Sequence, residues 1–184
     1  MNNMKIVLVG LGHEMHGDDE IGLEIVRRWS AEHKKEYSGL EVQTILLESP
    51  GINLLGSIAG LDAAILVAAV RSGAPQGTVQ ILKNEALSAW EGSGSKKGGW
   101  GAAETLSLGR QLAPEDLPEK LILIGIEGAA FGLGEGLSPA VRAAIPQALQ
   151  ALDQTLEEFT LKRGSIRWIF NWLINFLQKR TSSP

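Results

Sequence analysis

The chain of 184 residues contains no cysteine. This absence excludes disulfide bridges, zinc–thiolate sites, iron–sulfur clusters and cysteine nucleophiles. Apolar runs are short, and none reaches the roughly 18 residues that a membrane-spanning helix needs. Residues 1–12 carry one basic side chain, Lys5, and lead directly into a strand-like pattern, so no signal peptide is expected. These absences together predict a soluble, cytoplasmic protein.

Positive charge is also scarce. The 17 basic residues are outnumbered by 21 acidic residues, which gives a formal net charge of -4. A nucleic-acid partner is not expected from this balance, because binding to phosphates needs an excess of basic side chains. Hydrophobic residues make up 44% of the chain, which suits a globular protein that buries a sizeable core.

Short apolar segments alternate with segments of helical periodicity. Strands are predicted at residues 5–10, 40–48, 63–70, 78–83 and 120–126, and helices at 20–33, 52–61 and 102–112. A last helix is predicted to begin at Pro139, with Ser138 as its N-cap. The strands are apolar throughout, which is typical of a parallel sheet covered on both faces. The pattern therefore predicts an α/β fold, a three-layer sandwich with a mostly parallel sheet of about five strands.

In such sheets ligands bind where the loops gather at the carboxyl ends of the strands. The first of these loops reads "GLGHEMHGDDEIG" (residues 10–22). Gly10 and Gly12 begin a dinucleotide-binding pattern, but its third glycine is replaced by Met15. The histidines and aspartates of the same loop are typical of a metal site, although acids before a helix also serve as simple caps. Both interpretations remain open from these residues.

Three segments in order resemble one known family. "KIVLVGLGHEMHGDDEIGLEIV", "VRSGAPQGTV" and "LILIGIEG…GLSPAVRAAIPQAL" are similar to the nickel–iron hydrogenase maturation endopeptidases, over about residues 4–155. The resemblance implies an α/β fold and removal of a C-terminal extension from the precursor of a hydrogenase large subunit. It also implies that this partner carries the nickel, and that three side chains of the protease contact the metal.

Only one of these three ligands is retained. The resemblance places the first, an acid before the first helix, at Asp19. It places the second, an aspartate at the end of the third strand, at Ala68, and the third, a histidine of the glycine-rich loop, at Gly98. The asparagine that often follows G-x-G in the family is His13. Because nickel and zinc prefer imidazole, and a single carboxylate holds them poorly, the site is incomplete.

A rebuilt metal site is a second expectation. Asp19 and His16 are its predicted ligands, with His13, Glu48 or Glu127 as further donors. No catalytic residue is assigned. The chain is thus expected to be similar to a hydrogenase maturation protease. Two alternatives are an impaired relative that binds a hydrogenase subunit or another partner without cleaving it, and a nucleotide-binding module that uses the 10–18 loop.

Residues 161–184 differ in composition from residues 1–160, the expected endopeptidase-like domain. They are predicted to form a basic, aromatic, amphipathic C-terminal helix, which Gly164 separates from the preceding helix. The segment carries Trp168, Phe170, Trp172 and Phe176 but no acidic residue. Three interpretations of residues 165–180 remain open: packing on the domain, peripheral contact with a membrane surface, and docking on a partner or a second copy.

Overall fold

A five-stranded sheet lies at the centre of the molecule. The computed structural model describes residues 3–32, 36–48, 51–89 and 102–181, with residues 85, 88, 89 and 162–181 as backbone only. The strand order is β2-β1-β3-β5-β4. The strands are β1 (Met4–Leu11), β2 (Leu40–Leu47), β3 (Ala63–Val70), β4 (Val79–Lys83) and β5 (Lys120–Glu127). All neighbours are parallel except β4 and β5, which are antiparallel. The predicted mostly parallel sheet is confirmed.

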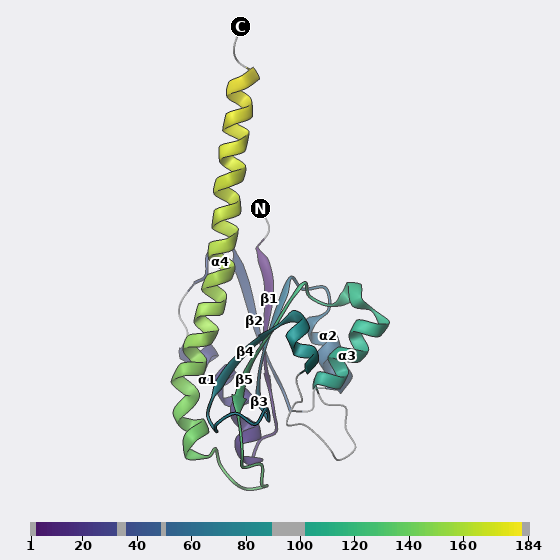
Figure 1. The fold of residues 1–184 in the computed structure, drawn as a ribbon, viewed down its shortest axis with the longest axis vertical. Coiled ribbons are helices and arrows are strands. Elements are labelled where there is room, and N and C mark those ends of the chain that lie inside the picture. Colours follow the sequence, from purple (N-terminus) through teal and green to yellow (C-terminus); the bar gives the residue numbers. More distant parts are fainter. Residues whose placement is uncertain (1–2, 33–35, 49–50, 90–101, 182–184) are drawn as a thin grey trace.

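Helices cover both faces of this sheet (Figure 1). One face packs against α1 (Ile21–Glu32) and α4 (Pro139–Thr181), and the other against α2 (Gly51–Ile58) and α3 (Ala102–Leu112). Short 3₁₀ segments are η1 (Gly17–Glu20), η2 (Asn84–Ala89) and η3 (Pro114–Asp116). Successive side chains of β1 alternate between the two cores: Ile6 and Leu8 face α1 and α4, whereas Val7 and Val9 face α2 and α3. Two covered faces explain why this strand is apolar without interruption.

Gly22 allows the start of α1 to lie directly on the sheet. A Cβ atom at this position would come within 2.2 Å of the carbonyl oxygens of Leu11 and Val67. Gly10 on β1 permits the same close approach from the side of the strand, since a Cβ atom on Gly10 would lie 2.7 Å from the Gly22 carbonyl oxygen. The chain leaves β1 toward β2 on one side and returns to β3 on the other. Helix α1 therefore begins over the point where the strand order reverses, which is the usual ligand site of open α/β sheets.

Helix α4 is fixed against α1 by a shared polar contact. The Asp153 carboxylate accepts hydrogen bonds from Trp29 Nε1 at 2.9 Å and from the Tyr37 hydroxyl at 3.0 Å. The helix begins as predicted at Pro139, and the Ser138 carbonyl accepts the N–H of Arg142 at 2.9 Å. These contacts set the direction in which α4 runs along the sheet.

The expected break at Gly164 is wrong. The backbone of α4 continues through this residue as one helix to Thr181. A glycine inside a helix costs only about 1 kcal/mol, so it does not end a helix by itself. The division between residues 1–160 and 161–184 stays a prediction. Within the described residues, no helix is long and apolar enough to cross a membrane.

Substituting Gly22 with alanine tests the close approach of α1 to the sheet. We expect Gly22→Ala to lower the free energy of unfolding by about 3 kcal/mol, because the new methyl group overlaps two backbone carbonyls. Gly56→Ala in α2 is the matched control, because nothing lies within 4 Å of the Cβ position of residue 56. We expect this substitution to raise the free energy of unfolding by about 0.5–1 kcal/mol. Urea unfolding measures both. A Gly22→Ala variant as stable as the parent would contradict this account.

Candidate active site at the carboxyl edge of the sheet

The loops that follow β1, β3 and β5 meet at the carboxyl edge of the sheet. The loop after β1 is bonded to the loop after β5: Gly134 N–H donates to the Met15 carbonyl at 2.7 Å, and Gly17 N–H donates to that of Glu135 at 3.0 Å. The segment of residues 90–101, which includes the Gly98 position, lies outside the described residues. The site is therefore built from residues 12–19, 68–78 and 127–138.

Asp19 and His13 form the central polar contact of this edge. His13 Nδ1 lies 2.8 Å from Asp19 Oδ2, and the two side chains are 39% and 13% exposed. An ionised carboxylate can only accept, so Nδ1 carries the hydrogen in this contact, and in the neutral form of the ring Nε2 has the lone pair. The His16 ring lies 5.6 Å from the His13 ring, centroid to centroid, and its Nδ1 donates to the Glu14 carbonyl at 2.9 Å. The two predicted ligands, Asp19 and His16, thus both contact His13.

The remaining expected ligands do not join this group. Ala68 lies on β3 opposite Gly125 of β5, is 5% exposed, and offers only a methyl group. Glu48 is exposed at the end of β2, and the carboxylate of Glu127 is bonded elsewhere. Among the residues that the structure describes, no three histidine, aspartate or glutamate side chains are grouped to hold a metal ion.

Asp18 holds the loop after β5 and the start of α4. Its side chain is fully buried, and its oxygens accept the N–H groups of Ala129 and Ala130 at 2.9 Å and of Ser138 at 2.8 Å. Burial is the largest single influence and would raise the pKa of Asp18. The three N–H groups and the Ser138 hydroxyl together outweigh it, so the pKa is lowered from 3.8. Asp18 is therefore a structural carboxylate and not a candidate ligand.

Glu127 has a comparable structural role for the turn after β3. This side chain is 4% exposed, and its carboxylate accepts the Ser72 hydroxyl at 2.7 Å and the N–H groups of Ser72 and Gly73 at 2.9 Å. The sequence predicts Glu127 only as a further metal donor and does not predict its hydrogen bonds to Ser72 and Gly73. A signal was present, because glycine-rich turns carry backbone N–H groups that a buried acid can satisfy.

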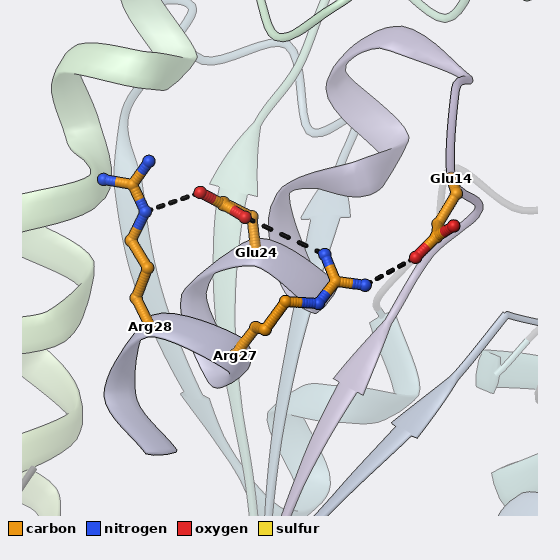
Figure 2. A network of polar contacts seen from close by, with 4 residues as sticks. All are labelled: Glu14, Glu24, Arg27 and Arg28. Atoms are coloured by element: carbon orange, nitrogen blue, oxygen red, sulfur yellow. Dashed lines mark hydrogen bonds and ion pairs between the residues drawn. The ribbon is translucent and has the colours of Figure 1, made fainter. Parts of the chain in front are cut away.

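A network of exposed charges fixes the position of the 12–16 loop. Figure 2 shows the Glu14 side chain pointing from the loop toward Arg27 of α1, at 2.5 Å, with Glu24 and Arg28 continuing the network. Such exposed pairs contribute about 0–1 kcal/mol each, so they orient the loop more than they stabilise the fold. Beside this network lies a cleft of about 340 Å³, lined by Glu14, Leu23, Arg27, Leu46, Leu47, Glu48 and Asn53.

The geometry of Gly12 does not favour the nucleotide-binding alternative. A Cβ atom on Gly12 would lie 1.9 Å from the Asp19 carbonyl oxygen, so the space beside this glycine is filled by the chain itself. In a dinucleotide site the second glycine leaves room for the pyrophosphate. The residues 13–16 also separate Gly12 from the first helical turn.

The low pKa of Asp18 predicts a pH-dependent contribution to stability. A group whose pKa is lower in the folded state stabilises above its unfolded pKa, and this contribution is lost as the pH falls through the folded value. At pH 7 we expect Asp18→Asn to lower the free energy of unfolding by about 2–3 kcal/mol. The difference in the free energy of unfolding between Asp18→Asn and the parent should become smaller below about pH 4, as the Asp18 carboxylate of the parent becomes protonated. Denaturant unfolding at several pH values measures this, with exposed Asp116→Asn as the control. A constant difference down to pH 2 would argue against it.

Comparisons with known proteins agree with this architecture. The family model HycI, described as hydrogenase maturation protease, matches residues 31–155. The chain is 30% identical over 158 residues to the hydrogenase 2 maturation protease of Escherichia coli K12, covering 84% of this chain and 92% of that protein. The structure of the hydrogenase maturating endopeptidase HybD from E. coli matches with a TM-score of 0.70 and 28% identity, over 84% of this chain and 93% of that one. A [NiFe] hydrogenase maturation protease HybD from Thermococcus kodakarensis shares the fold, with a TM-score of 0.63 and 20% identity, over 83% and 99% of the two chains. The chain therefore belongs to the hydrogenase maturation protease family.

Proposed function

We propose that this chain acts on the precursor of a nickel–iron hydrogenase large subunit and removes its C-terminal extension. The observation that carries the proposal is Asp19, which lies at the carboxyl edge of the sheet, where the family resemblance expects a metal-contacting acid. In this proposal nickel is part of the substrate.

The proposed nickel-facing groups are Asp19, His13 and His16. Imidazole nitrogens are suitable ligands for nickel, whereas the side chains of Ala68 and Gly98 have no donor atom. The two histidines therefore supply donor atoms that these two positions lack. The Asp19 carboxylate at 2.8 Å from Nδ1 orients the His13 ring so that Nε2 is the donor atom. All three groups come from one loop and its 3₁₀ segment, so they approach a metal ion from one side. In this proposal the substrate supplies the other ligands of the nickel.

Four exposed apolar side chains on elements of this edge, here called the apolar surface, support docking of a large protein partner. Met15, Leu46, Ile52 and Leu133 are 65%, 42%, 70% and 74% exposed, respectively. They belong to the loop after β1, the end of β2, the start of α2 and the loop after β5. Apolar side chains gathered at a site edge are typical of protein-binding surfaces. The cleft beside Glu48 lies within this surface and suits an extended segment of the partner.

A relative that binds the precursor without cleaving it is the second candidate function. The observation in its favour is Ala68 on β3, which offers only a methyl group where the family resemblance expects a second metal-contacting carboxylate. In this case the same surface retains the precursor, and another protein processes it. Cleavage is the property that separates the two candidates.

Incubation with a nickel-loaded large-subunit precursor, followed by mass spectrometry, tests the proposal. We expect loss of the C-terminal extension with the parent chain and at least a tenfold lower rate with Asp19→Ala or His13→Ala. The neighbouring Glu20→Gln variant is the control and should keep the parent rate. A precursor that binds but stays at full length supports the second candidate, and a rate unaffected by Asp19→Ala removes Asp19 from the site.

Charge substitutions on the apolar surface test the docking face. We expect Leu133→Glu and Met15→Glu each to weaken precursor binding about tenfold, which corresponds to about 1.4 kcal/mol. Both side chains are exposed, so thermal unfolding of the variants should match the parent. Leu112→Glu is the matched control, since Leu112 is 72% exposed at the end of α3. Binding by surface plasmon resonance that is equal for all three variants would place the partner elsewhere.

A further inference from the structure

Helix α4 extends well beyond the part that packs on the sheet. Its core-facing residues recur at helical spacing and end at Phe159; they are Val141, Ala144, Ile145, Ala148, Ala151, Leu152, Leu156 and Phe159. Leu161, the next large apolar side chain, is 69% exposed. The helix then continues to Thr181, a rise of about 33 Å beyond Phe159. Figure 1 shows this part running past the strands with no other described helix or strand beside it. The structure therefore gives no support to packing of residues 165–180 on the domain.

The charge of this extension is opposite to that of the rest of the chain. None of the 21 acidic residues lies beyond Glu158, whereas five of the 17 basic residues do, namely Lys162, Arg163, Arg167, Lys179 and Arg180. The extension is thus formally +5 and residues 1–158 are formally -9. The family model matches residues 31–155, so the extension lies outside the matched range. Its charge favours an anionic surface as the contact.

The sequence of the extension fits a lipid interface better than a protein groove. At helical spacing Arg167, Asn171, Asn175 and Gln178 occupy an arc of about 80°, and the remaining positions from 166 to 177 are apolar. A groove covers one narrow stripe of a helix, whereas a lipid interface accommodates a wide apolar arc. Tryptophan favours the headgroup region, and the basic pairs at residues 162–163 and 179–180 flank the apolar positions at both ends. A second copy of the extension would bring two +5 segments together.

We propose that residues 165–180 form a membrane-binding helix that lies in the headgroup region of anionic phospholipid. The twelve residues from 166 to 177 rise about 18 Å, less than the hydrocarbon thickness of about 30 Å, so the helix lies at the surface. Binding combines burial of the aromatic side chains with attraction of basic side chains to lipid phosphates, three within this helix and two, Lys162 and Arg163, just before it. The proposal does not depend on whether the family domain cleaves the precursor.

Flotation of the full chain with lipid vesicles tests this proposal. We expect the parent to float with vesicles of phosphatidylcholine and phosphatidylglycerol, and to float at least fivefold less with phosphatidylcholine alone or in 0.5 M salt. Two double variants should each reduce flotation at least fivefold. One replaces both tryptophans (Trp168→Ser with Trp172→Ser), and the other replaces the last basic pair (Lys179→Gln with Arg180→Gln). Lys34→Gln, Lys35→Gln removes the same charge outside the extension and should float like the parent.

Three outcomes would overturn the proposal. They are absence of flotation with anionic vesicles, equal flotation of the parent and the Trp168→Ser, Trp172→Ser variant, and flotation that ignores lipid charge. Circular dichroism and thermal unfolding of the variants check that the domain stays folded, which is expected because the core residues of α4 end at Phe159. Sedimentation without lipid checks for a dimer. A dimer that needs Trp168 and Trp172 and does not bind vesicles would assign the extension to self-association.

Discussion

The buried carboxylate of Asp18 is the interaction on which the carboxyl edge of the sheet depends. Three backbone N–H groups of the loop after β5 and of the start of α4 donate to it, from residues 111 to 120 positions away in the chain. The adjacent residue, Asp19, carries the polar contact with His13. One side chain therefore closes the loops while its neighbour faces the site. A buried charge without these donors would cost several kcal/mol, so the loops and the carboxylate stabilise one another.

The contacts that hold the loops do not use the positions where the family resemblance expects metal ligands. The close approach of α1 at Gly22, the Asp18 contacts and the Glu127 contacts hold the loops through backbone groups. None of them uses a side chain at residue 68. Alanine is compatible with the buried surroundings of that position, because an apolar side chain in a core needs no polar partner. The fold therefore depends on the carboxylates of Asp18 and Glu127 and does not depend on a carboxylate at residue 68.

The sequence predicted what depends on local periodicity. The segments 63–70 and 102–112 were predicted with the bounds observed for β3 and α3, and β1, β2 and β5 agree within one residue at each end. The continuity of α4 through Gly164 was not predicted, because a glycine lowers helix propensity without deciding against a helix. The partners of Asp18 and Glu127 were not predicted either. Hydrogen bonds between residues more than 50 positions apart depend on the packed loops, which no local pattern reveals.

The direction of α4 places the carboxyl edge of the sheet and the extension of the helix at opposite ends of the domain. The helix starts at the site edge, where Ser138 donates to Asp18, and runs antiparallel to β1 toward the amino ends of the strands (Figure 1). Its extension therefore leaves the domain at the edge opposite His13 and Asp19. The core-packed part from Pro139 to Phe159 alone rises about 30 Å. A helix without a break keeps this separation, so lipid contacts made by the extension lie at the opposite end of α4 from His13 and Asp19.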